Sequence, residues 1–179
     1  MPDQLRDAPM EKNGLNASGV TVASAQREAL RWIVSLLQEN HLPFMICGGL
    51  AAIGYGSRRV MHDIDILVRG EHFKEVVRLG EACISKPARR YLEEREGWDI
   101  EYVQFKHGDI KIEVGSLLDA KIFNSAASRW VPLKADFSHL EVRDLFGIPV
   151  PLMNRSELIE YKRQLGRPVD LLDIQAITG

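Results

Sequence analysis

Residues 48–68 read GGLAAIGYGSRRVMHDIDILV, and this stretch decides the fold that we expect of the chain. It opens with two glycines, continues through a short apolar segment, and ends where aspartates alternate with aliphatic residues. The alternation predicts a strand over residues 64–68. Side chains two positions apart on a strand share one face, roughly 7 Å apart. Asp63 and Asp65 should therefore point together, with the isoleucines on the opposite face.

Two carboxylates at that spacing repel each other by about 2 kcal/mol at an effective dielectric near 20. A fold tolerates the repulsion where water screens the pair or a cation lies between them. An exposed edge strand with an acidic outer face would give the same pattern. The Asp-x-Asp motif alone therefore leaves metal binding and simple solvent exposure both open.

A third carboxylate lies on a later predicted strand. Residues 100–105 and 110–114 alternate on either side of a turn-forming His107-Gly108-Asp109 sequence, which predicts a β-hairpin. The isoleucines of the second strand occupy one face, so Lys111 and Glu113 take the other. If this strand neighbours the aspartates, Glu113 completes a cluster of oxygen ligands suited to Mg²⁺ or Mn²⁺. Alternatively, Glu113 is an ordinary cross-strand partner of a lysine or arginine.

The glycine pair is the third element of the motif. The apolar residues 44–47 predict a buried strand, Gly48 and Gly49 end it, and residues 50–55 predict a short helix. A turn of this kind exposes backbone N–H groups that favour an anion. A tight turn without a ligand is the alternative. Neither the Gly-x-Gly-x-x-Gly nor the P-loop pattern is present, so those two nucleotide-binding classes lack support.

The remaining patterns fill in a mixed fold. Apolar periodicity and capping signals predict helices over residues 25–40, 71–84, 154–165 and 168–177. The densely charged residues 86–97 predict a solvated helix or loop. Short strands are expected near residues 130–133 and 148–152. We expect an α/β (α+β) protein with a small mixed sheet flanked by helices. Its parts would be a flexible arm (residues 1–22), a core (23–153) and a C-terminal helical segment packed on the core (154–179).

Composition narrows the functional classes. The chain has 179 residues and a net charge of −2, which gives no general attraction to nucleic acid or anionic membranes. No apolar run is long enough to span a bilayer, and the N-terminus lacks the apolar stretch of a signal peptide. Its two cysteines, Cys47 and Cys83, form neither a disulfide framework nor a zinc pattern, which favours the cytoplasm.

Taken together, the glycine turn, the short helix, the Asp-x-Asp motif and the later acid resemble the signature of the DNA polymerase β-type nucleotidyltransferase superfamily. The stretch 48–68 is most similar to the branch of minimal nucleotidyltransferases and AbiEii-type toxin enzymes. In this resemblance Arg59 matches the basic residue that precedes the acids. One departure is Met61, where the branch usually has Thr or Ser. His62 is similar to a histidine near this motif in some antibiotic adenylyltransferases.

The C-terminal helices carry charges on apolar faces. Lys162 lies between Leu158 and Leu165 at helical spacing, and Asp170 shares a face with Ile174. Burying an unpaired charge costs several kcal/mol, so the two either pair with each other or bind a ligand. The resemblance implies the second reading. In the family, a late K…R…RxxD-type segment follows the core, and here it is matched by Lys162, Arg167 and Asp170.

The resemblance implies a metal-dependent transfer of a nucleoside monophosphate from an NTP to a hydroxyl, with release of pyrophosphate. Asp63, Asp65 and Glu113 would be catalytic and would hold Mg²⁺ or Mn²⁺, as two ions about 4 Å apart. Nucleotide binding would fall to Gly48, Gly49, Arg59 and Lys162, and the acceptor side to Arg167 and Asp170.

The acceptor stays open between tRNA or other RNA, a protein side chain and an antibiotic of the aminoglycoside or lincosamide kind. The toxin-like branch favours a macromolecule and a cognate antitoxin as partner, and a homodimer stays open. No membrane association is expected. A catalytically inactive binding protein with the same fold is the alternative, because Met61 removes the usual hydroxyl.

Overall fold

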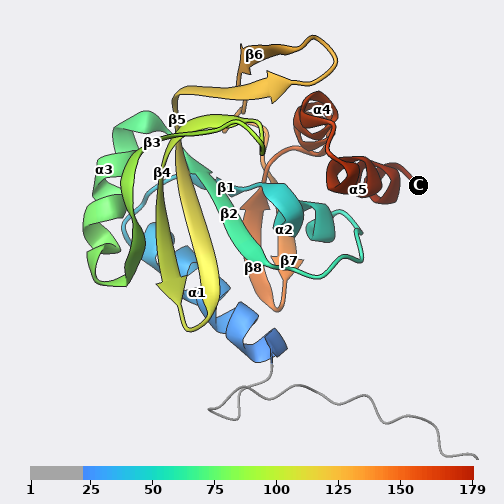
Figure 1. Cartoon of the computed structure of the whole chain (residues 1–179). Coiled ribbons are helices and arrows are strands. Elements are labelled where there is room, and N and C mark those ends of the chain that lie inside the picture. The colour runs from blue at the N-terminus through green and yellow to red at the C-terminus, as the bar shows by residue number, and fades with distance from the viewer. Residues whose placement is uncertain (1–21) are drawn as a thin grey trace, which may run out of the picture.

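The computed structural model describes residues 22–179 and places all its strands in one sheet with helices on both sides (Figure 1). The predicted N-terminal arm lies outside the described residues, except for its last position. The helices are α1 (Val22–Glu39), α2 (Gly48–Gly54), α3 (Gly70–Leu79), the 3₁₀ turn η1 (Glu81–Cys83), α4 (Arg155–Leu165) and α5 (Pro168–Thr178). The strands are β1 (Phe44–Ile46), β2 (Asp63–Val68), β3 (Ile84–Glu93), β4 (Trp98–His107), β5 (Ile110–Asn124), β6 (Arg129–Pro132), β7 (Glu141–Leu145) and β8 (Ile148–Leu152).

The sheet is mixed, as the sequence predicted. Its strands run in the order β3-β4-β5-β2-β1-β8-β7, and β6 pairs with the far end of β5. The β2–β5 and β1–β8 pairs are parallel, and the other pairs are antiparallel. The two strands that carry the candidate acids, β2 and β5, are therefore direct neighbours in the middle of the sheet.

The two faces of the sheet have different coverings. Trp32 of α1 packs edge-on against Phe105, and the chain after α3 approaches the same ring, so both helices cover one face. Ile64, Ile66 and Ile112 are fully buried on that side. On the other side, α2 packs on β2, α4 packs on β5, and α5 packs on α2 and α4 (Figure 1). The aspartates face this second side, where the helices leave part of the sheet uncovered.

The structure differs from the sequence prediction at two edge strands. Residues 86–97, expected as a solvated helix or loop, contain most of β3, an edge strand that pairs only with β4 among residues 22–179. Charged side chains are typical of edge strands, because they oppose pairing with another chain. The strand β7 was not predicted at all. It is a polar edge strand joined to β8 by Phe146-Gly147, both with positive φ, as two-residue hairpin turns require.

The C-terminal segment forms as its signals predicted. The side chain of Asn154 caps α4 by accepting a hydrogen bond from the Ser156 N–H. Gly166 ends α4 in the left-handed conformation, and Pro168 begins α5. None of the helices within residues 22–179 has the length and apolar character needed to cross a bilayer.

Candidate active site

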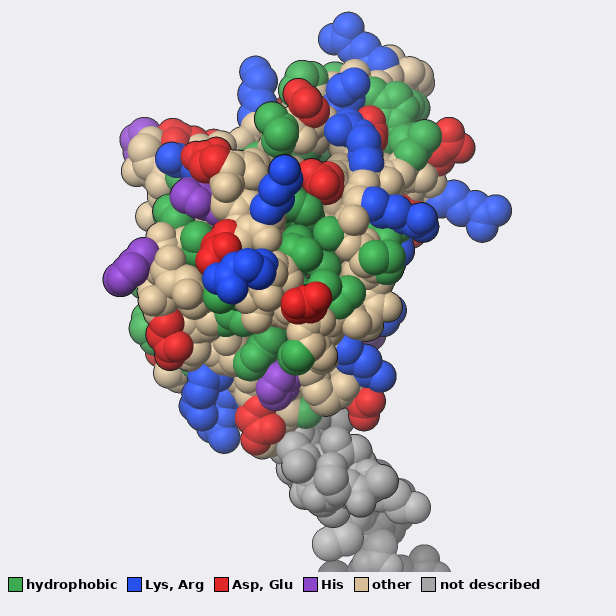
Figure 2. Space-filling model, turned by 90° about the vertical axis from the view of Figure 1, so that its left-hand side faces the viewer, with side chains coloured by type: hydrophobic (Ala, Val, Ile, Leu, Met, Phe, Trp, Pro, Cys, Tyr) green, Lys and Arg blue, Asp and Glu red, His purple; other side chains and the backbone are tan. Residues whose placement is uncertain are grey.

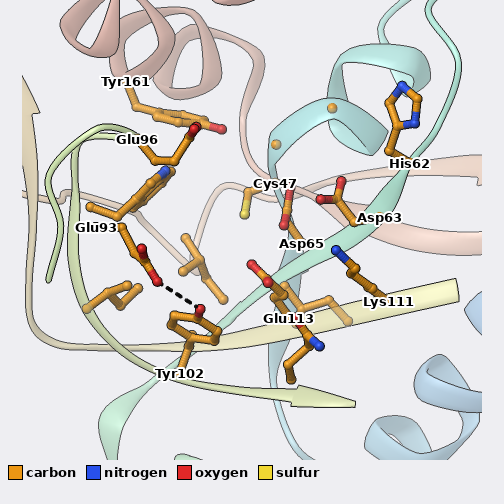
Figure 3. Close-up of a pocket in the computed structure, with 18 of the residues that line it drawn as sticks. Cys47, His62, Asp63, Asp65, Glu93, Glu96, Tyr102, Lys111, Glu113 and Tyr161 are labelled. Carbon is orange, nitrogen blue, oxygen red and sulfur yellow. Dashed lines mark hydrogen bonds between the residues drawn. The ribbon is translucent and has the colours of Figure 1, made fainter. Parts of the chain in front are cut away.

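The three candidate acids share one side of two neighbouring strands. In the parallel register of β2 and β5, Asp65 is paired with Glu113 and Asp63 with Lys111. Figure 3 shows the carboxylates of Asp63, Asp65 and Glu113 directed into the same space. The conditional prediction that the hairpin strand neighbours the aspartates is thus confirmed at the level of strand pairing.

That space is a pocket of about 570 Å³. The glycine turn and Arg59 border it at one end, and the acids of β2 and β5 form its floor. Its other end extends over β4 and β3 and under the C-terminal helices. Of the residues predicted for the site, only Asp170 does not line it. The predicted residues that do are Gly48, Gly49, Arg59, Asp63, Asp65, Glu113, Lys162 and Arg167.

The acids are electrostatically crowded. Burial, together with the nearby carboxylates of Asp63 and Glu113, raises the pKa of Asp65 to about 8, although Lys162 and Arg167 oppose the shift. Burial and the Asp63 carboxylate also raise the pKa of Glu113. The thiol of Cys47 lies beside Asp65 in Figure 3, and burial raises its pKa well above its ordinary value. The site therefore crowds carboxyl groups whose ionised forms a bound cation would stabilise.

The donor set suits a divalent metal ion. Carboxylate oxygens are the ligands that Mg²⁺ and Mn²⁺ prefer, and the mutual repulsion of the acids would fall on binding one. As they stand, no three His, Cys, Asp or Glu side chains within residues 22–179 are arranged to enclose a metal ion. Magnesium sites in enzymes often use one or two protein carboxylates and take further oxygens from substrate phosphates. Asp63 and Asp65 fit that kind of site.

The glycine turn is shaped by its neighbours. Gly48 has a φ of +63°, a conformation that side chains disfavour, and its Cα lies against the Asp65 carboxylate. A Cβ atom at Gly49 would lie 3.1 Å from Cζ of Arg59. Gly48 is thus required by its close approach to a candidate metal ligand, and Gly49 leaves room for the arginine of the pocket.

A buried charge network lies behind the pocket. Nζ of Lys162, a residue only 1% exposed, contacts Asp170 at 3.3 Å and Asp173 at 2.8 Å. Arg167 binds the other oxygen of Asp170 at 2.7 Å, and Arg59 binds Asp173 at 2.9 Å. Of the two readings that the sequence left open for Lys162 and Asp170, the structure shows pairing. A fully buried, doubly paired Asp170 does not support direct contact with an acceptor.

Sequence reasoning missed Asp173, which is 1% exposed and central to this network. A signal for it was present, because Asp173 follows Asp170 by three positions and so lies on the same inward side of α5.

The structure also shows where Met61 lies. Its side chain is buried in the hydrophobic core, outside the residues that line the pocket, so it supplies packing there.

Sequence reasoning also missed the far end of the pocket. Trp98 of β4 and Tyr161 of α4 lie with ring centroids 5.7 Å apart, and both line the cavity. Lys86 of β3 bonds to Glu93 and to the hydroxyl of Tyr102 (Figure 3 shows the Glu93–Tyr102 contact). Tyr161 is far from the β3 and β4 residues in the chain. The contacts among Lys86, Glu93 and Tyr102 depend on the pairing of β3 with β4, which the sequence analysis did not predict.

Comparisons with known proteins identify the fold. No protein-family model matches the sequence, and a search of curated proteins finds no match. Among solved structures, the chain is similar to a candidate nucleotidyltransferase from Thermotoga maritima, with 19% identity, coverage of 84% of this chain and 90% of that one, and a TM-score of 0.66. The chain therefore has the nucleotidyltransferase fold, as the glycine turn and Asp-x-Asp motif predicted.

Two further similar structures contain an antibiotic or an adenylylated antibiotic. The chain is similar to ANT(2″)-Ia in complex with adenylyl-2″-tobramycin, at 19% identity, 85% and 87% coverage and a TM-score of 0.57. It is also similar to the lincosamide antibiotic adenylyltransferase LnuA bound to lincomycin, at 15% identity, 85% and 96% coverage and a TM-score of 0.52. Similarity at these identities establishes the fold, and the AbiEii-type branch stays a prediction.

Proposed function

We propose that the protein transfers a nucleoside monophosphate from an NTP to a hydroxyl group of an acceptor. The acceptor oxygen forms a bond to the α-phosphorus, the bond from that phosphorus to the bridging oxygen breaks, and pyrophosphate leaves. The observation that carries the proposal is the grouping of Asp63, Asp65 and Glu113 on adjacent strands, in a pocket that begins at the glycine turn. The nucleotidyltransferase fold of the chain supports it.

The acids would hold Mg²⁺ or Mn²⁺, with Asp63 and Asp65 as the principal ligands and Glu113 beside them. When bound, such a metal supplies charge neutralisation for the triphosphate and lowers the pKa of the attacking hydroxyl. Glu113 is also the group placed to accept the hydroxyl proton, because burial raises its pKa and so makes it a stronger base.

The remaining groups would orient the nucleotide. Arg59 stands at the edge of the glycine turn, where its guanidinium can neutralise charge that moves to the leaving pyrophosphate. Lys162 is held by two carboxylates and would act on the site through its charge. Transfers of this kind depend on positioning and electrostatics more than on covalent chemistry by the protein.

The pocket favours a small-molecule acceptor over a macromolecule. The acceptor would lie beyond Glu113 from the glycine turn, over β4 and β3, where Trp98 and Tyr161 form aromatic walls. Aromatic surfaces of this kind bind ring-containing molecules. On the face shown in Figure 2, acidic and basic side chains are interspersed, a surface unlike the basic stripe typical of nucleic-acid binders. The similarity to enzymes in complex with antibiotics points the same way.

Transfer from labelled NTP tests the proposal. The protein is incubated with α-labelled ATP, GTP, CTP or UTP, Mg²⁺ and cell extract, and the label is separated into RNA, protein and small-molecule fractions. We expect label in the small-molecule fraction, and none with Asp63→Asn. Label in RNA or protein would show transfer to a macromolecule and overturn the acceptor assignment. Defined aminoglycosides and lincosamides are tested in parallel as acceptors.

A second variant tests which ligand binds at which end of the pocket. Trp98→Ala removes an aromatic wall without touching the acids or the glycine turn. We expect it to raise the KM for the acceptor about tenfold, because buried aromatic contacts are typical anchors, and to leave the KM for NTP within about twofold. A rise in the KM for NTP alone would place the nucleotide at this end and contradict the arrangement.

A further inference from the structure

Asp173 joins three segments of the chain at one buried carboxylate. It accepts hydrogen bonds from the Ser57 hydroxyl at 3.1 Å, from Nη1 of Arg59 at 2.9 Å and from Nζ of Lys162 at 2.8 Å. Ser57 and Arg59 follow α2, Lys162 belongs to α4, and Asp173 itself lies on α5. With both oxygens occupied and 1% exposure, the carboxylate is fixed in one orientation.

We propose that Asp173 is a positioning residue that fixes Arg59 against the glycine turn for contact with the nucleotide phosphates. Asp173 touches no substrate, and its effect on the reaction passes through Arg59. The inference rests on the proposed function, because it presupposes that an NTP binds in the pocket.

The geometry of Arg59 supports this role. Its guanidinium lies so close to Gly49 that an added Cβ atom would be 3.2 Å from Nη1, the same nitrogen that binds Asp173. Within residues 22–179, the bond to Asp173 is the one hydrogen bond that the Arg59 side chain makes. Nε and Nη2 can therefore donate to a ligand. The side chain is 28% exposed and lines the pocket. Arg59 therefore has one nitrogen bound to Asp173, while its side chain lines the pocket beside the glycine turn.

Holding the arginine in advance has an energetic consequence. A free arginine side chain loses much rotamer freedom when it binds a phosphate, and this loss weakens binding. Asp173 fixes the guanidinium before the nucleotide arrives, and Lys162 binds the same carboxylate oxygen as Arg59. The planar fork of arginine carries several N–H groups, so one can bind the aspartate while another binds a phosphate.

A double-mutant cycle on NTP affinity tests the inference, with binding measured by calorimetry in Mg²⁺. Asp173→Asn keeps the size of the side chain and removes its charge. We expect it to raise the Kd for NTP about tenfold, the usual effect of losing one hydrogen bond to a charged group. Arg59→Ala should weaken binding at least as much. The double variant should bind within about threefold of Arg59→Ala, because the two residues act as one unit.

Ser57→Ala is the matched control. It removes the hydrogen bond to the other oxygen of Asp173 and leaves the Arg59 contact in place. Its melting temperature should fall, as for any lost buried hydrogen bond, while the Kd for NTP stays within about twofold. A structural role for Asp173 would predict the same pattern for Asp173→Asn as for Ser57→Ala.

The outcomes separate the inference from the proposed function. If the unmodified protein does not bind NTP, both fall together. If it binds NTP and Asp173→Asn binds equally well, or if the two effects multiply in the double variant, the inference alone is wrong. Should Asp173→Asn not fold, Arg59→Lys replaces it. The ammonium keeps the charge but cannot reach Asp173 and a phosphate together, so affinity should fall about tenfold. Unchanged affinity would overturn the inference.

Discussion

The carboxylate of Asp65 lies directly against the backbone of Gly48, so closely that a methyl group on the glycine would overlap it. This contact joins the two halves of the sequence motif in space. The glycine that begins α2 makes room for the aspartate in the middle of β2. The main chain reinforces the pairing, because the Cys47 N–H donates to the Asp65 carbonyl at 2.9 Å. The spacing of the motif thus has a structural cause.

Gly48→Ala should therefore disable the site. The substitution adds a side chain at a φ of +63° and forces Asp65 to move. We expect a loss of roughly 1–2 kcal/mol in unfolding free energy from the backbone strain alone, and a fall in transfer of at least about a hundredfold. Gly56→Ala is the control, because Gly56 also has positive φ but open space around it. Denaturation measures the stability of both variants, and transfer assays measure their activity. Equal transfer activity in Gly48→Ala and Gly56→Ala would contradict the close contact between Gly48 and Asp65.

Asp65 should make stability depend on pH in an unusual direction. Its pKa is raised to about 8 in the fold, whereas an unfolded aspartate titrates near 4. Between these values the folded state binds the extra proton, so this group's contribution to stability falls as pH rises, by at most about 1.4 kcal/mol per pH unit. Below about pH 4 the contribution is fully present. Above about pH 8 it is lost.

Chemical denaturation across that pH range, without divalent ions, measures the effect. The protein should lose more stability between pH 5 and 8, by about 1 kcal/mol or more, than the Asp65→Asn variant does. Added Mg²⁺ should recover stability at pH 8 in the unmodified protein and not in the variant. Parallel pH profiles for the two proteins would mean that Asp65 is not crowded by its neighbours.

Glu113→Gln should separate chemistry from binding. The amide keeps the size of the side chain but cannot accept a proton. We expect kcat to fall by about a hundredfold or more, because general bases contribute at least that much, while the KM for NTP stays within about threefold. Steady-state kinetics at saturating acceptor give both values. An unchanged kcat would assign the proton to another group.

Lys162→Met should destabilise the fold. It leaves Asp170 and Asp173 short of a cation in a buried site, and breaking a buried ion pair costs about 3–5 kcal/mol. The adjacent Arg163 pairs with Glu160 at the surface, with a side chain that is 61% exposed. Arg163→Met should therefore cost less than about 1 kcal/mol. Similar losses for the two variants, measured by urea unfolding, would show that the network contributes little.

The sequence predicted those parts of the fold that depend on local patterns. The strand of alternating aspartates, the hairpin and the capped C-terminal helices all depend on periodicity, turns and caps within short segments. The edge strands β3 and β7 were not predicted, because their charged, exposed residues resemble those of loops. Only their pairing with β4 and β8 makes them strands. Tertiary contacts override local propensity at such edges.

The site was likewise predictable only in part. The positions of Asp63, Asp65 and Glu113 followed from side-chain alternation once the two strands were taken as neighbours. The contact between Arg59 and Asp173 could not follow, because the two residues meet across 114 positions of the chain. The aromatic wall of Trp98 and Tyr161 is likewise assembled only when α4 packs over the sheet.

Calorimetric titration of MgATP, or another NTP, into the protein and into Asp63→Asn tests the central claim most directly. Asp63 is only partly buried, so the variant should fold, as circular dichroism can verify. The account predicts NTP binding by the unmodified protein that requires Mg²⁺ and is lost in Asp63→Asn. Binding that is absent from the unmodified protein, or that is equal in the variant or without Mg²⁺, would contradict a metal-dependent nucleotide site at these acids.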